Sequence, residues 1–228
     1  MRLVRPLLQS TAALVLCGAP LLLVLPPVPD LQPILTELLD QGRVPNLVST
    51  VILHTRLYDT VSEVVVFTLA SIGVRWIFSG QPQQRRVLAL NDAPSVVLCQ
   101  LGATMCALVA VELALRGHLS PGGGFAAGVA GGTAIGLLLI SGSARLTDRL
   151  YQRYRADLWE KGAVVAFLLV AWLSLEGVFP GGAAGSGGRF GAIASGGWIP
   201  LLNVLVAVKV TLGSWAMVQL LVRYRGLF

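Results

Sequence analysis

Apolar residues in this chain occur in runs of about twenty, and shorter polar segments separate the runs. An α-helix of that length crosses the hydrocarbon layer of a bilayer. The pattern therefore predicts an all-α integral membrane protein with about six transmembrane helices. The expected helices cover residues 7–25, 60–78, 95–115, 121–140, 162–179 and 199–222.

Two stretches of the pattern allow more than one interpretation. Residues 7–25 could be a signal peptide, but no small-residue cleavage site follows them, so we prefer an uncleaved helix. Residues 47–58 contain His54 and Arg56, which are unfavourable in lipid. We expect them to form an interfacial or a re-entrant helix that Asn46 caps.

Lys and Arg residues are distributed unevenly between the two sides of the predicted bundle. With six crossings, twelve lie on the side of the termini and four on the other side, and Lys209 inside the last helix completes the 17. Connections rich in Lys and Arg stay in the cytoplasm. Both termini are therefore expected to be cytoplasmic.

The low content of charged residues agrees with a membrane protein. Only 12% of the residues are charged and 55% are hydrophobic, with a mean hydropathy of +0.75, whereas soluble domains carry about 25% charged residues. The net charge of +6 does not indicate nucleic-acid binding, because the basic residues lie in the connections and not on one face.

The sequence contains no pattern for enzymatic or cofactor chemistry. Phosphate-binding loops, nucleophile motifs and zinc motifs are missing from it. The 2 histidines lie far apart, and the 3 cysteines lie in apolar runs without a CxxC pair. We expect a protein without enzymatic activity, cofactor or metal site.

Residues 117–124 are expected to break the chain between two membrane helices. Ser120 and Pro121 suit the N-cap and the first position of the helix at 121–140. Three glycines follow, Gly122, Gly123 and Gly124. Their uncovered first-turn amides attract negative charge or ordered water, and His118 titrates near physiological pH. The segment is either a polar access point for a proton or cation, or a tight turn against another subunit.

Glycines recur every four residues in this helix, at Gly124, Gly128, Gly132 and Gly136. This spacing places them on nearly one helix face. Small residues let a neighbouring backbone approach closely inside a membrane. We expect the glycine face to pack against another helix and not to carry chemistry.

Lys209 is the deepest ionisable residue of the predicted topology. It lies nine residues beyond Pro200, roughly 13 Å along its helix. At that depth it needs a carboxylate, a water-filled cavity or a partner subunit, unless it snorkels to the interface. Glu63 or Glu112 is its expected internal partner, although both carboxylates could instead form interfacial salt bridges, such as Glu112 with Arg116.

Two stretches resemble known membrane subunits. GHLSPGGGF at residues 117–125 resembles the GHxxPGGGF signature of the B subunit of Mrp-type multisubunit Na⁺/H⁺ antiporters, which a membrane-bound hydrogenase subunit shares. TRLYDTVSEVVVFTLASIGV at residues 55–74 resembles the C-terminal tail of the antiporter A subunit, a small separate subunit in hydrogenases. The matching positions are Asp59 and Glu63 for the tail motif, and Gly117, His118, Pro121, Gly122, Gly123, Gly124 and Phe125 for the B motif.

The resemblance implies two modules, a two-helix module in residues 1–80 and a four-helix module in residues 90–228. It implies a non-catalytic subunit that contributes to Na⁺ and H⁺ antiport beside large complex-I-like A and D subunits and small membrane subunits. The expected location is the bacterial plasma membrane, with a thylakoid-type membrane as an alternative. The candidate ion path comprises Asp59, Glu63, Glu112, His118 and Lys209. The alternative function is a structural or assembly membrane subunit of a complex-I-like or membrane-bound hydrogenase-type complex, without an ion path of its own.

Overall fold

The structure of the chain is a computed structural model. It describes residues 10–15, 17–18, 30–82, 89–90, 92–177, 189–193 and 195–225. The chain divides into two compact units, Met1–Ile34 and Leu35–Phe228. In the first unit residues 10–15 are helical, and most of the expected helix at residues 7–25 lies outside the described residues.

Five helices among the described residues are long and apolar enough to cross a membrane. They are Leu57–Phe78, Ala93–Arg116, Gly124–Arg153, Ala156–Leu175 and Ile199–Tyr224. Of the described residues 82% are helical, and none of them belongs to a strand. The chain is therefore an all-α integral membrane protein, and five of the expected crossings correspond to these helices.

Short helices and π-helical turns connect the long ones. In chain order the described elements are α2 (Gln32–Gly42), α3 (Leu47–Thr50), η1 (Val51–Thr55), α4 (Leu57–Phe78), α5 (Ala93–Arg116), α6 (Gly124–Leu138), η2 (Leu139–Ser143), α7 (Ala144–Arg153), α8 (Ala156–Leu175) and α9 (Ile199–Arg225). The π-turn η2 joins α6 to α7 and is kinked, since Ser141 and Gly142 have non-helical backbone angles.

The segment before α4 consists of α3 and η1. Asn46 caps α3 as predicted, because its side-chain oxygen accepts a hydrogen bond from the Val48 amide at 3.1 Å. Arg56 leaves the helical conformation, with φ −116° and ψ 33°, and thereby separates η1 from α4. The Thr60 hydroxyl donates to the Ile52 carbonyl at 2.6 Å and ties the two pieces together.

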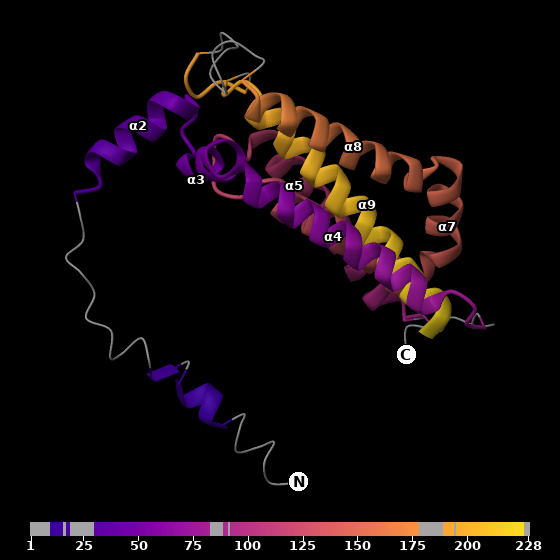
Figure 1. The fold of residues 1–228 in the computed structure, drawn as a ribbon. Helices are drawn as coiled ribbons and strands as arrows, with labels where there is room; N and C mark the ends of the chain where they lie inside the picture. The colour runs from indigo at the N-terminus through magenta and orange to yellow at the C-terminus, as the bar shows by residue number, and fades with distance from the viewer. Residues whose placement is uncertain are drawn as a thin grey trace. The chain divides into compact units, whose positions relative to one another are not determined.

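Helix α9 is the common packing partner of the long helices. It contacts α4, α5, α6 and α8, and Figure 1 shows it in yellow, running beside α4 and α8. Buried apolar residues occur along its whole length, at Ile199, Leu202, Val206, Ala207, Val210, Ala216 and Val222. A helix buried on several sides belongs to the interior of a bundle.

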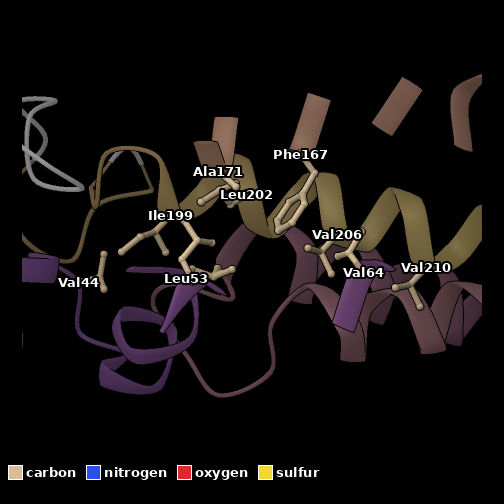
Figure 2. Packing of buried hydrophobic residues seen from close by; sticks show 10 residues of the cluster. Val44, Leu53, Val64, Phe167, Ala171, Ile199, Leu202, Val206 and Val210 are labelled. Carbon is tan, nitrogen blue, oxygen red and sulfur yellow. The ribbon is translucent and has the colours of Figure 1, made fainter. Parts of the chain in front are cut away.

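An apolar cluster joins α9 to α4 and α8 (Figure 2). Phe167 of α8 is fully buried in it, together with Val64 of α4 and Val206 of α9. Lipid tails are as apolar as these side chains, so exclusion from water does not hold them together in a membrane. The cluster is stabilised by close van der Waals packing.

Helix α5 packs on α6 and α9 and leaves much of its remaining surface uncovered. Its exposed large apolar residues include Val97, Leu98, Leu101, Met105, Leu108 and Val109. Water would not favour such a contiguous apolar surface. It suits contact with lipid or with a neighbouring membrane subunit.

Candidate functional site

Helix α8 begins earlier than the sequence pattern predicted, and this changes the chemistry of the bundle. The expected start at Gly162 is wrong, because the helix begins at Ala156. Arg155 adopts a left-handed conformation, with φ 49°, and ends the preceding turn, while Asp157 in the first turn favours a helix start. The earlier start brings Glu160, which we had assigned to a polar connection, into the helix, where it is only 4% exposed.

Glu160 forms a buried ion pair with Lys209 of α9. The Lys209 Nζ atom lies 2.7 Å from Glu160 Oε1, and the two side chains are 1% and 6% exposed. Lys209 Nζ also lies 5.1 Å from the centre of the Phe67 ring, a distance that permits a cation–π contact. The ammonium group is therefore in contact with a carboxylate and an aromatic face.

Arg75 of α4 binds the same carboxylate from the other side. Its Nη2 atom lies 2.9 Å from Glu160 Oε2, so each carboxylate oxygen has its own cation. The Ser71 hydroxyl lies 3.5 Å from Glu160 Oε1, a weak contact. The Tyr151 hydroxyl of α7 lies 3.4 Å from Arg75 Nη2. We call Arg75, Glu160 and Lys209 the charge cluster.

The expected pairing of Lys209 with Glu63 or Glu112 is wrong. Glu63 is exposed on α4, and Glu112 is exposed on α5, where it accepts a hydrogen bond from Arg116 at 2.8 Å. Asp59 is exposed and pairs with Arg56. The structure thus brings Lys209 into the charge cluster and places the three other carboxylates of the predicted ion path outside it. The earlier start of α8 is the physical reason, since it supplies a nearer carboxylate.

The break between α5 and α6 is held by polar side chains of other elements. Asn46 donates through Nδ2 to the carbonyls of Gly117, at 2.7 Å, and Ser120, at 2.8 Å. The Ser49 hydroxyl donates to the same Gly117 carbonyl at 2.6 Å. Asn203 of α9 donates to the carbonyl of Ala114 at 2.7 Å. Buried irregular backbone requires such partners, because its carbonyls have no helical amide to accept from.

The predicted start of the helix at Pro121 is wrong by three residues. Gly122 and Gly123 have φ values of 146° and 101°, which an α-helix cannot contain, so α6 begins at Gly124. Only glycine adopts such angles without strain. Ser120 does not cap the helix, and its hydroxyl instead donates to the Arg116 carbonyl at 3.3 Å.

His118 lies in this break and is fully buried. Within the described residues neither ring nitrogen makes a hydrogen bond of normal geometry. Burial lowers the pKa of His118 below its usual 6.5, and the nearby carbonyls of Ala192 and Ile193 oppose this shift. Burial has the larger effect, so the imidazole is held in its neutral form.

The glycine face of α6 lies against α9. A Cβ atom at Gly124 would come within 2.5 Å of the Asn203 carbonyl oxygen, and one at Gly128 within 2.3 Å of Val210 Cβ. At Gly132 it would come within 2.7 Å of Ser214 Cβ. Gly136 has open space and takes no part in the contact. The neighbour that these glycines admit is thus a helix of the same chain.

A family described as a domain related to the MnhB subunit of Na⁺/H⁺ antiporter matches residues 94–216, more than half of the chain. The chain belongs to the MnhB family. The comparison with curated proteins returned no match at the required significance. The MnhB-family fold is similar to a chain in the structure of the membrane-bound sulfane sulfur reductase (MBS), an archaeal respiratory membrane complex. That likeness has a TM-score of 0.75 at 22% identity and covers 97% of this chain and 99% of the other.

The matched range of the MnhB family contains part of the site and not all of it. Glu160, Lys209 and the break around His118 lie inside residues 94–216, whereas Arg75 and Asn46 precede them. The N-terminal part of this MnhB-family chain therefore completes both the charge cluster and the break. Family and fold together support a multi-pass membrane subunit of a multisubunit complex.

Glu160 and Arg75 are the members of the site that the sequence analysis missed. The buried positions of α8 are Ala156, Glu160, Ala163, Phe167 and Ala171. Their spacing of three and four places Glu160 on the buried helix face. This periodicity would have revealed it, because a lone carboxylate on an apolar face needs a cation. No comparable pattern marks Arg75, which lies in the last turn of α4.

Proposed function

We propose that this MnhB-family chain is a membrane subunit of a multisubunit monovalent cation/proton antiporter, and that Lys209 takes up and releases a proton during transport. The observation that carries the proposal is the charge cluster, in which one buried carboxylate is shared by two cations of different chemistry. Ionisable groups inside a membrane bundle mark ion and proton pathways.

The charges of the cluster favour Lys209 as the proton carrier. A guanidinium group does not act as a proton donor at physiological pH, whereas an ammonium group can. When Lys209 loses its proton, Glu160 and Arg75 remain as a neutral ion pair. When Glu160 gains one, two cations remain together without a counter-ion. Loss of the proton from Lys209 leaves the charge cluster without net charge, so it costs less free energy than protonation of Glu160.

The partners that we propose are large complex-I-like A and D subunits and small membrane subunits. The exposed apolar surface of α5 and the similarity to a chain of a respiratory membrane complex support assembly within a membrane. We place the chain in the bacterial plasma membrane with both termini in the cytoplasm. We retain the two modules, residues 1–80 and 90–228, as part of this proposal.

A structural subunit without an ion path is the second candidate. The observation in its favour is the break around His118, whose carbonyls are bound by Asn46, Ser49 and Asn203. A break satisfied in this way can serve packing alone. In that case the complex should need the polar contacts of the break and not the charges of Glu160 and Lys209.

The decisive experiment uses inverted vesicles that contain the full complex. Dissipation of a pH gradient on addition of Na⁺ is measured for Lys209→Ala, Lys209→Arg and Glu160→Gln. We expect each variant to lose most antiport. Lys209→Ala removes the amine, Lys209→Arg introduces a group that cannot release its proton, and Glu160→Gln removes the counter-ion. Co-purification of the partner subunits shows that the complex is assembled.

Glu176→Gln is the matched control, since Glu176 is the C-cap residue at the other end of α8 and is exposed. It should transport like the wild type. Full antiport by all three cluster variants would reject the proton-carrier role and leave the structural role.

A further inference from the structure

Two cavities meet at Arg75. The first has a volume of about 290 Å³, and its lining includes Arg75, Asp148, Tyr151, Gln219 and Arg223. The second has a volume of about 240 Å³, and its lining includes Ser71, Arg75, Glu160 and Lys209. Arg223 is close to the end of α9 at Arg225, so the first cavity lies toward that end of the bundle. Together they lead from the end of the bundle to the charge cluster.

Two polar atoms of α9 near the first cavity indicate water. Gln219 donates through Nε2 to Asp148, but its Oε1 atom is buried without a hydrogen-bond partner in the described residues. The indole nitrogen of Trp215 is likewise buried and unpartnered there. Buried polar atoms of this kind normally bind ordered water, and a cavity of this volume accommodates several molecules.

We propose that the two cavities form a proton access path from the Arg223 end of the bundle to Lys209, with Arg75 where they meet. This inference rests on the function proposed above. The Tyr151 and Ser71 hydroxyls lie on either side of Arg75, and each can donate and accept a hydrogen bond. A proton passes along them and the intervening water to the neutral Lys209 amine, where an N–H bond forms as a water O–H bond breaks.

The charged groups along this path select protons over metal cations. Arg75 lines both cavities, and Arg223 binds Asp148 near the mouth of the first. A fixed guanidinium repels Na⁺ and cannot itself release a proton. A proton needs no room of its own, since it moves by exchange between neighbouring hydroxyls and water. Na⁺ must therefore cross the complex elsewhere.

The groups that face Glu160 set the conditions for this transfer. Arg75 approaches it from α4 and Lys209 from α9, and Tyr151 of α7 lies beyond Arg75. On α8 itself, Asp157 lines the first cavity and Lys161 lines the second. These two residues pair with each other at 3.7 Å in an exposed position, so the buried cations act on Glu160 more strongly.

Tyr151→Phe tests the hydroxyl step in the full complex. The phenyl ring keeps the edge-to-face contact with Trp215, whose ring centre is 5.2 Å away, so packing is retained. We expect Na⁺-driven proton transport to fall several-fold, with the larger loss at alkaline pH, where protons are scarce. Tyr154→Phe is the matched control, because it removes an exposed hydroxyl at the end of α7 that lines neither cavity, and it should not change the pH profile.

Cysteine labelling tests whether water reaches the cluster. Cys17, Cys99 and Cys106 are replaced, and a cysteine is introduced by Ala216→Cys in the first cavity, by Ser71→Cys in the second, or by Leu169→Cys on an exposed apolar face of α8. A small, anionic, membrane-impermeant thiol reagent, which Arg75 does not repel, is applied from the Arg223 side and should modify the first two positions and not the third.

The outcomes separate this path from the proposed function. Unmodified cysteines at 216 and 71, or wild-type transport with an unchanged pH profile in Tyr151→Phe, would overturn the path. If Glu160→Gln still abolishes transport in that case, the proton-carrier role of Lys209 remains and its access route lies elsewhere. If Glu160→Gln is also fully active, both proposals fail.

Discussion

Gly213 lies one helical turn beyond Lys209 and provides the space in which Lys209 reaches Glu160. A Cβ atom at position 213 would be 3.2 Å from both Lys209 Nζ and Glu160 Oε1, and 2.7 Å from Phe67 Cε1. The ion pair and the aromatic ring thus occupy the volume that any larger residue would need. A glycine here makes room for a charged side chain, in the same way that the glycines of α6 make room for a neighbouring helix.

We predict that Gly213→Ala separates Lys209 from Glu160 and lowers both stability and transport. Insertion of a methyl group into a filled site costs about 1–3 kcal/mol. Thermal unfolding of the purified complex and antiport in vesicles measure the two effects. Gly162→Ala is the control, because a Cβ atom there meets nothing within 4 Å. Equal behaviour of the two variants would show that the pair tolerates displacement.

The contact between α6 and α9 gives a second prediction. Gly128→Ala places a Cβ atom 2.3 Å from Val210 Cβ and 3.2 Å from the Ala207 carbonyl oxygen, so the helices must move apart. We expect a loss of about 1–3 kcal/mol in the free energy of unfolding. Gly136→Ala, in open space on the same helix, should be neutral or stabilising by about 0.5–1 kcal/mol. Comparison of the two melting curves checks this, and a harmless Gly128→Ala would contradict the close contact.

Asn46 should be a critical residue of the break, although it lies far from it in the sequence. Asn46→Ala removes the cap of α3 and both hydrogen bonds to the carbonyls of Gly117 and Ser120. We expect a loss of about 2–3 kcal/mol, measured by thermal unfolding. Asn46→Asp keeps the cap acceptor, but it replaces the donor by a carboxylate oxygen that faces the two carbonyls. It should therefore be no more stable than Asn46→Ala. Asp92→Ala, which removes an exposed cap on α5, should cost only about 1 kcal/mol.

The burial of His118 predicts a pH dependence of stability. Its folded-state pKa lies below the unfolded value of about 6.5, so the unfolded chain binds more protons as the pH falls. The contribution of the neutral imidazole is therefore complete above pH about 6.5 and is lost as the pH drops toward the lowered pKa. His118→Gln should flatten this part of the profile. Melting temperatures measured across that range in wild type and variant provide the check, and parallel profiles would refute it.

The apolar pattern predicted the fold well, because a membrane-spanning helix requires a run of about twenty apolar residues that is visible in the sequence. The glycine spacing in α6 and the depth of Lys209 could also be recognised, since both depend on positions within one helix. Glu160 is missed as long as the residues before Gly162 are counted as a polar connection, and the spacing of the buried positions of α8 is the signal that reveals it. The start of α6 was misplaced because Pro121 is a good first residue only when the following glycines are helical, and Gly122 and Gly123 are not.

The order of the cluster along the chain has a consequence for biogenesis. Arg75 of α4 and Glu160 of α8 are both synthesised before Lys209 of α9, so both members of the neutral Arg–Glu pair are present in the nascent chain before its last helix is made. Lys209 is thus synthesised after Glu160, the carboxylate that it pairs with. The ammonium group of Lys209, which is the excess positive charge of the cluster, therefore enters the membrane after Arg75 and Glu160 have been synthesised.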